Sequence, residues 1–155
     1  MTIERRLARA GFTLTRDYPV PRERVWAAFA EEEQKRAWFG AGDTFEPGEW
    51  AFDFRIGGRD IGEATFHDGP VSRYEATYTD IVDLQRIVFT YDMWIDGRHL
   101  STSLTTIALE PDGDQTRLTY TEQGVHFDGL DTVEGREEGS RGLLDQLGSY
   151  LAPGH

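Results

Sequence analysis

The chain has 155 residues, 16 basic and 28 acidic, which gives a formal net charge of −12. This length fits one domain, residues 1–155, with a single core. The absence of Cys excludes disulfides, thiolate catalysis and Cys-based zinc sites. Nucleic acids and anionic membranes are disfavoured as partners, because their negative phosphate groups repel a protein with a large negative net charge. We see no long apolar run and no hydrophobic leader, so we expect no membrane insertion and a cytoplasmic location.

A strand and a helix are predicted at the start of the chain. Apolar and polar residues alternate over Phe12–Tyr18, which is typical of a strand with one buried face. Pro21 then suits the first position of a helix, where its missing N–H has no partner to lose. Val25, Ala28 and Phe29 follow at i, i+3 and i+4. We therefore expect these three residues in the core.

A second short helix is predicted over Glu32–Trp38, ending near Gly40 and Gly42. Its charged run from Glu31 to Arg36 indicates a solvated helix face. Lys35 is the only lysine in the chain and lies in this run. We therefore expect it at the surface, and not as a Schiff-base lysine buried in an apolar site.

The middle of the chain changes to strand-like alternation, which predicts six strands joined by short turns. The expected strands cover Trp50–Ile56, Arg59–Phe66, Arg73–Asp83, Arg86–Ile95, Arg98–Glu110 and Thr116–Val125. The expected turns are Gly57-Gly58, Asp68-Gly69-Pro70, Asp96-Gly97 and Pro111-Asp112-Gly113. Because parallel neighbours need a crossover of about a dozen residues, these short links predict an antiparallel meander.

The last part of the chain returns to a helical period. Asp131 and Glu134 have the spacing of a capping box, with Asp in the place of Ser or Thr. The helix that follows has a largely apolar face, made of Ser140, Leu143, Leu144, Leu147, Tyr150 and Leu151. Gly139 and Gly142 interrupt it, which indicates either close packing on the sheet or room for a ligand. One sheet with one long helix across its face is a two-layer α+β fold.

Strong catalytic motifs are missing from the sequence. It lacks G-x-S-x-G, H-E-x-x-H and G-x-x-x-x-G-K-[ST]. His126 and Asp128 have a spacing that suits two metal ligands, but two ligands at a strand end indicate a surface turn more than a metal site. We therefore expect no metal and no cofactor.

Aromatic residues are the most informative feature, since they form 12% of the chain and fall mostly on the predicted strands. Alternation puts Tyr78, Tyr91 and Tyr120 on the face turned toward the long helix. Glu122 shares this face with Leu118, which brings a carboxyl group to the end of an apolar cavity. Burial there disfavours the charged form and makes Glu122 a candidate acid, base or ligand anchor. The alternative is that it pairs with an Arg or lies at an open rim.

Small hydroxyl residues lie on the presumed inner face of the strand Arg98–Glu110. Ser101, Ser103 and Thr105 share this face with apolar residues. Such residues leave space and offer polar groups to a ligand. A slip of one residue in the strand would instead place them on a solvent-facing side.

Several stretches together resemble one family over nearly the whole chain. They are Phe12–Pro19, Val25–Phe29 and Trp38-Phe39, the D-x-R-x-G-G turn within Phe52–Gly58, the late strand Thr116–Gln123 and the helical segment Gly142–Leu147. A Trp that is common near the start of this helix is absent. In order and spacing these stretches resemble the SRPBCC superfamily of START-like and birch-pollen-allergen-like helix-grip folds. The nearest branch is the one named after the C-terminal domain of the activator of heat-shock protein 90 ATPase.

This resemblance implies a curved seven-stranded antiparallel sheet that grips a long C-terminal helix, with a hydrophobic cavity between them. Members of the superfamily bind lipids, sterols, polyketides or hormones, and some are cyclases or hydratases. Because a fold does not determine a function, the resemblance does not choose among these. No set of catalytic residues belongs to this branch, so none is assigned here.

Three hypotheses of function follow. The first is binding of a small apolar or aromatic molecule in the cavity, and its candidate ligand-binding residues are Phe54, Tyr78, Tyr91, Ser103, Tyr120, Glu122 and Leu143. The second is an enzyme for polyketide-like cyclisation, dehydration or hydrolysis, with Glu122 as general acid or base and a Tyr polarising a carbonyl. The third is an interaction protein associated with a chaperone. We favour the first because the inner face is rich in aromatic residues and has small Ser and Thr positions, and because no catalytic signature is found. A homodimer is compatible with all three.

Overall fold

The computed structural model describes residues 5–39, 45–66, 69–130 and 132–152. Its elements are β1 (Leu7–Tyr18), α1 (Arg22–Ala30), α2 (Glu32–Trp38), β2 (Phe45–Phe52), β3 (Arg59–Phe66), β4 (Val71–Val82), β5 (Arg86–Ile95), β6 (Arg98–Asp112), β7 (Gln115–Phe127) and α3 (Val133–Leu151). The strands form one antiparallel sheet in the order β1-β7-β6-β5-β4-β3-β2. The α+β helix-grip architecture expected from the sequence is confirmed.

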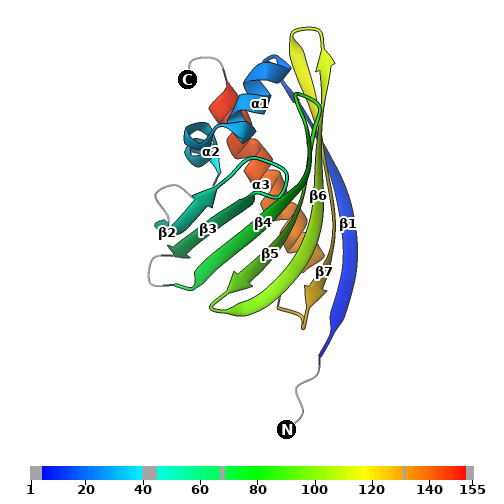
Figure 1. Ribbon diagram of the computed structural model, residues 1–155. Coiled ribbons are helices and arrows are strands. Elements are labelled where there is room, and N and C mark those ends of the chain that lie inside the picture. The colour runs from blue at the N-terminus through cyan, green and yellow to red at the C-terminus, as the bar shows by residue number, and fades with distance from the viewer. Residues whose placement is uncertain (1–4, 40–44, 67–68, 131, 153–155) are drawn as a thin grey trace.

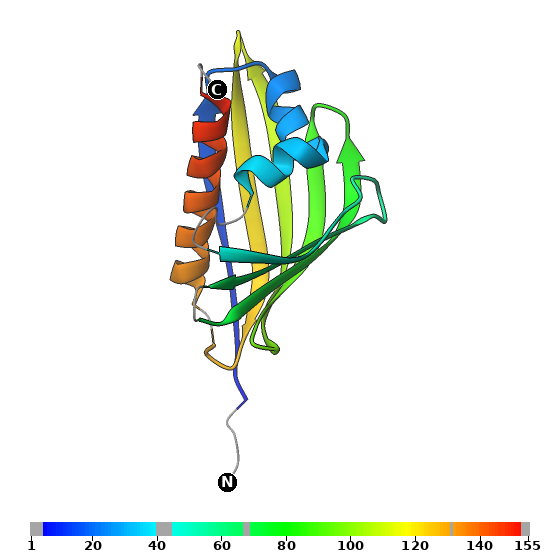
Figure 2. The ribbon, with the colours of Figure 1, turned by 90° about the vertical axis from the view of Figure 1, so that its left-hand side faces the viewer.

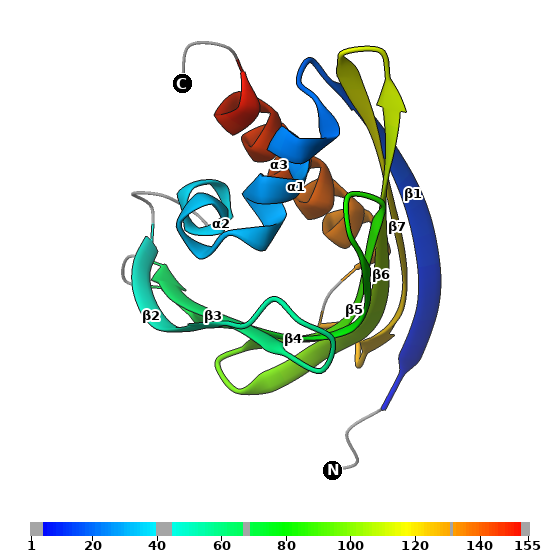
Figure 3. The ribbon, with the colours of Figure 1, turned by 45° about the horizontal axis from the view of Figure 1, so that its top comes forward.

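The sheet is strongly curved, and α3 lies along its concave side (Figure 1). Figure 2 shows α1 and α2 next to the C-terminal half of α3, on the same side of the sheet. In Figure 3 the strands run around the three helices from β2 to β1. The described helices thus all lie on the concave side of the sheet.

The core holds α3 against the sheet. Leu144, Leu147 and Leu151 are at most 2% exposed and pack with strand residues such as Leu118. Tyr18, at the end of β1, donates its hydroxyl hydrogen to the Leu144 carbonyl at 2.8 Å. This bond satisfies the buried phenol and ties the edge strand to the helix.

The strand β2 ends earlier than the sequence predicts. The alternation through Ile56 predicts a longer strand, but β2 ends at Phe52, and Ile56 is 58% exposed in a turn. The Asp53 amide donates to the Arg59 carbonyl at 3.0 Å and closes this turn. Only glycine is tolerated at position 58, because a Cβ there would lie 2.1 Å from the carbonyl oxygen of Asp53 and clash with it. Tight turn geometry therefore overrides the alternating pattern.

Other boundaries also differ from the sequence prediction: β1 begins at Leu7, β2 at Phe45 and β4 at Val71, and β7 covers Gln115–Phe127. Pro111 and Asp112 belong to β6, and the turn lies at Gly113, which has a φ of +61°. The side-chain cap of α3 is Thr132, whose hydroxyl accepts a hydrogen bond from the Gly135 amide at 2.9 Å. The expected cap Asp131 lies outside the described residues, as do Gly40, Gly42 and Asp68. No helix within the described ranges is long and apolar enough to cross a bilayer.

Candidate functional site

A cavity of about 750 Å³ lies between the concave face of the sheet and the helices α2 and α3. Small-molecule sites commonly have volumes of about 300–1,000 Å³. Aromatic side chains dominate the lining, which includes Phe29, Trp38, Phe39, Trp50, Phe54, Tyr74, Tyr78, Phe89, Tyr91 and Tyr120. Lys35, Arg36 and Arg136 add three cationic side chains to this lining.

The structure brings most of the predicted site residues to this cavity. Those that line it are Phe54, Tyr78, Tyr91, Tyr120 and Leu143. Glu122 and Ser103 face inward, at 2% and 3% exposure, but neither is part of the lining. Ser103 instead borders a second hollow formed by β1, β5, β6 and β7, and its hydroxyl has no hydrogen-bond partner among the described residues.

The centre of the cavity wall is a row of three rings. The centroids of Phe39 and Tyr74 are 5.3 Å apart, and those of Tyr74 and Tyr91 are 5.1 Å apart. A cation lies at each end of the row: the Lys35 ammonium is 4.7 Å from the Phe39 centroid, and the Arg136 guanidinium is 5.6 Å from that of Tyr91. Aromatic ligands can stack on such rings, and the cations can orient their polar groups.

Glu122 lies behind this wall in a hydrogen-bonded network. Tyr91 and Tyr120 donate to its Oε1 at 2.7 and 2.9 Å. The Arg136 Nη1 atom lies 3.9 Å from Oε2 of Glu122 and donates to the Tyr91 hydroxyl at 2.8 Å. Glu122 thus pairs with an Arg, which is one of the alternatives considered from sequence. Burial raises the pKa of Tyr91 and of Tyr120, so both hydroxyls stay protonated and their rings stay in place.

Lys35 is buried, which contradicts the expectation of a solvated position. It is 5% exposed, and its Nζ donates to Oδ2 of Asp60 at 2.7 Å and to the Tyr78 hydroxyl at 3.4 Å. Tyr78 also donates to Oδ2 of Asp60, at 3.0 Å. The expectation was wrong because Lys35 precedes Trp38 by three residues and so shares its face of α2, which turns toward the sheet.

The chemistry of Lys35 follows from this pairing. Burial opposes its charged form, but attraction by the oxygens of Tyr78 and Asp60 outweighs burial and raises the pKa of Lys35 above its ordinary value. Burial also raises the pKa of Tyr78 to about 12, against the effect of the Lys35 charge. A Schiff base requires a neutral amine. Lys35 therefore lines the cavity as an ammonium group paired with Asp60, and not as a nucleophile.

Gly139 and Gly142 resolve the two interpretations of the long helix. Both line the cavity, and a Cβ added to either would meet no atom within 4 Å. Close packing of the helix on the sheet is therefore not their role. Both are exposed and line the cavity, so they leave its mouth open along α3.

His126 and Asp128 occupy different surroundings. His126 lies on β7 and is 5% exposed, so its expected place in a surface turn is wrong. Asp128 has a φ of +58° and accepts hydrogen bonds from Arg5 Nε at 3.1 Å and from the Arg6 amide at 2.9 Å. In the ranges that the structure describes, no three His, Asp or Glu side chains form a group that could hold a metal ion.

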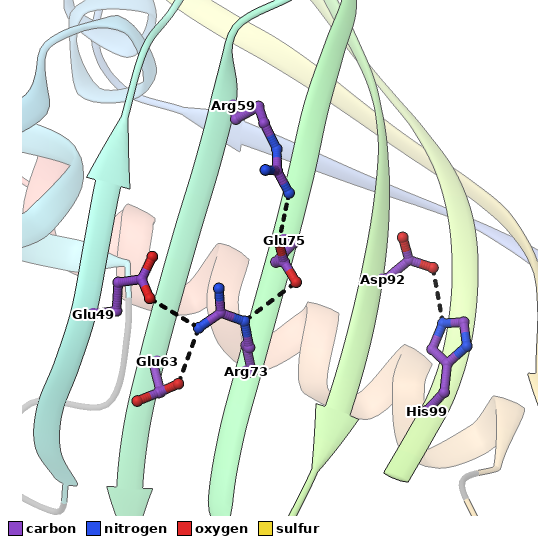
Figure 4. A network of polar contacts seen from close by, with 7 residues as sticks. All are labelled: Glu49, Arg59, Glu63, Arg73, Glu75, Asp92 and His99. Carbon is purple, nitrogen blue, oxygen red and sulfur yellow. Dashed lines mark hydrogen bonds and ion pairs between the residues drawn. The ribbon is translucent and has the colours of Figure 1, made fainter. Parts of the chain in front are cut away.

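A separate charged network lies on the convex face of the sheet (Figure 4). Arg73 on β4 contacts Glu49 on β2, Glu63 on β3 and its own strand neighbour Glu75, at 3.3, 3.0 and 3.2 Å. In this view α3 lies behind the strands, so the network faces away from the helix. Surface ion pairs each contribute about 0–1 kcal/mol. This partly exposed network links three neighbouring strands.

The family follows from a comparison with known proteins. The family model described as Activator of Hsp90 ATPase homolog 1-like protein matches residues 19–152. The chain belongs to this family. This confirms the resemblance seen in the sequence, and it places the cavity within an SRPBCC helix-grip domain.

Solved structures of similar proteins support this assignment. Mll3558 from Rhizobium loti is 47% identical, with a TM-score of 0.88 over 94% of this chain and 99% of that one. A putative uncharacterized protein from Rhizobium leguminosarum is 33% identical, with a TM-score of 0.90 over 96% and 97% of the two chains. DynU16, a putative protein in the dynemicin biosynthetic locus, shares the fold at 18% identity and a TM-score of 0.67, covering 93% of this chain and 48% of that one. No curated protein matches the chain.

Proposed function

We propose that this protein binds a small, largely aromatic molecule in the cavity between the sheet and α3. The observation that carries the proposal is the cavity of about 750 Å³, whose lining includes ten aromatic side chains. Each aromatic contact of good geometry contributes about 0.5–1.5 kcal/mol beyond the burial of apolar area. The row Phe39, Tyr74 and Tyr91 offers several such contacts to one ligand.

The polar groups of the cavity support binding in a fixed orientation. Lys35 and Arg136 have carboxylate neighbours in Asp60 and Glu122, so their charges are balanced and held in place. A few fixed polar groups in an apolar cavity are typical of small-molecule sites. The membership of the SRPBCC superfamily points in the same direction.

A titration with the fluorescent probe N-phenyl-1-naphthylamine tests the proposal. We expect saturable binding to the wild type. Gly142→Leu places a side chain at the mouth of the cavity, which Gly142 lines, and should weaken binding about tenfold or more. Ser149→Leu puts the same side chain on an exposed position of α3 outside the lining, and should bind like the wild type. Absence of saturable binding, or equal affinity in both variants, would overturn the proposal.

An enzyme that uses the same cavity is a second candidate. Tyr78 favours it, because this protonated hydroxyl lines the cavity and can transfer its hydrogen bond from Asp60 to a substrate carbonyl, while Lys35 still balances the Asp60 charge. Mass spectrometry of a co-purified or added ligand would show a changed mass with the wild type and an unchanged mass with Tyr78→Phe. Unchanged ligand from both proteins contradicts this candidate. A chaperone-associated role is the third, resting on the family description alone, and isothermal titration against Hsp90 tests it.

A further inference from the structure

A glycine on β3 creates a slot in the floor of the cavity. Trp50, Gly62 and Tyr74 are cross-strand partners in one row over β2, β3 and β4, and all three line the cavity. A Cβ at Gly62 would come no closer than 4.0 Å to any atom, the nearest being in the Trp50 ring. Since neighbouring strands lie about 4.8 Å apart, the backbones of Trp50 and Tyr74 are about 10 Å apart. This backbone spacing is about what one planar ring needs between two flanking side chains, at about 3.5–4 Å on each side.

The hydroxyl of Tyr74 is a free donor beside this slot. Tyr74 lines the cavity, and its hydroxyl makes no hydrogen bond within the part of the chain that the structure describes. The hydroxyls of Tyr78, Tyr91 and Tyr120, by contrast, all donate to carboxylates. Burial raises the pKa of Tyr74 well above its ordinary value, so the group remains a donor. A ligand oxygen is the partner that this donor lacks.

Arg36 is the cation of the cavity lining that has no carboxylate partner among the described residues. Its guanidinium lies 4.8 Å from the centroid of the Trp50 ring, so it reaches the slot from α2. Glu32, one turn earlier on α2, accepts a hydrogen bond from Trp50 Nε1 at 3.1 Å instead. An exposed guanidinium at the rim of a cavity suits a carboxylate, which it can bind through two parallel N–H donors.

We propose that the ligand is a planar aromatic carboxylate. Its ring lies over Gly62 between Trp50 and Tyr74, its carboxylate binds Arg36, and one of its oxygens accepts the Tyr74 hydrogen. The ligand carries one negative charge, because Lys35 and Arg136 are already balanced by carboxylates in the wall. This inference rests on the proposed function and specifies its ligand class.

Calorimetric titration with 2-naphthoate and with 2-naphthamide, two probes of equal size, tests the charge. The wild type should bind 2-naphthoate about tenfold more tightly than the neutral amide, as expected for a charge-assisted hydrogen bond. In Arg36→Gln this preference should fall below about twofold. Arg98→Gln makes the same change of net charge at an exposed position outside the cavity, and should keep the preference.

Two further variants test the slot and the donor. Gly62→Val fills the slot and should weaken both probes about tenfold, whereas Thr65→Val on the same strand, outside the lining, should not. Tyr74→Phe keeps the ring and should weaken 2-naphthoate about threefold without a change in Tm.

The outcomes separate the two proposals. Equal affinity for acid and amide, or a preference that survives in Arg36→Gln, overturns the carboxylate assignment but leaves binding in the cavity intact. Failure of both naphthyl probes and of N-phenyl-1-naphthylamine to bind overturns the proposed function together with this inference.

Discussion

The buried pair Lys35–Asp60 makes a sharp prediction about stability. Asp60→Asn keeps the shape of the side chain but removes the charge that balances Lys35, which is 2.7 Å away and 6% exposed. Removing one partner of a buried pair costs about 3–5 kcal/mol, because the other charge remains without compensation. With an unfolding entropy of about 2.1 cal/mol/K per residue over 155 residues, this loss lowers Tm by about 9–15 °C.

Denaturant unfolding at pH 7, followed by tryptophan fluorescence, measures this loss. The double variant Lys35→Met, Asp60→Asn removes both charges and should recover most of the stability, which gives a double-mutant cycle with a large coupling energy. Asp145→Asn removes one carboxylate from an exposed pair with Arg16 and should change stability by less than about 1 kcal/mol. If Asp60→Asn changes stability no more than Asp145→Asn, or if the double variant is less stable than Asp60→Asn, the reasoning about buried charge is refuted.

Three further predictions concern pH, the helix cap and two glycines. The pKa of Tyr78 is raised from 10.0 to about 12, so its contribution to stability is complete below pH 10 and is lost as the pH rises through about 12. Between pH 10 and 12 the free energy of unfolding, measured by denaturant titration, should therefore fall less for Tyr78→Phe than for the wild type. Parallel curves of unfolding free energy against pH for the two proteins would contradict this. Thr132→Ala removes the side-chain acceptor for the Gly135 amide and should lower the free energy of unfolding by about 1 kcal/mol, or Tm by about 3 °C; an unchanged melting curve would show that the cap contributes nothing. Gly58→Ala and Gly139→Ala should act in opposite directions: a Cβ at Gly58 lies 2.1 Å from a carbonyl oxygen, whereas one at Gly139 meets nothing and raises helix propensity by about 1 kcal/mol. Changes of the same sign in thermal melts would argue against both.

The periods of the apolar residues predict most of the fold. The bounds Glu32–Trp38, Arg59–Phe66 and Arg86–Ile95 are the same in the sequence prediction and in the structure. This is possible because one buried face imposes a period that can be seen locally. Phe54 keeps the period of β2 after the strand has ended, because it turns inward to pack on Tyr78, at 5.1 Å between centroids. Such packing depends on the neighbouring strands, which the local pattern does not contain.

The candidate site is only partly visible in the sequence. Tyr78, Tyr91 and Tyr120 can be placed by alternation alone, and the structure puts all three in the cavity lining. The burial of Lys35 was missed, since its partner Asp60 comes 25 residues later and only the fold brings them together. The sequence feature that could have indicated the burial of Lys35 is its spacing of three residues from Trp38, which puts both on one face of α2. The gap at Gly62 likewise depends on strand register, which sets its neighbours in the sheet.

The ladder between β1 and β7 has a consequence for how the chain folds. It pairs Leu7 with Phe127 and Tyr18 with Thr116, so the strand made first has a partner that is made last. The hairpin of β5 and β6 needs only its own short turn and can form within about 1–10 μs. At a synthesis rate of about 5–20 residues per second, β1 instead waits about 5–20 s for β7. An unpaired strand invites association with other chains, and charged side chains oppose this. Arg9 and Asp17 put charged side chains on β1, and we expect them to oppose such association while β7 is not yet made.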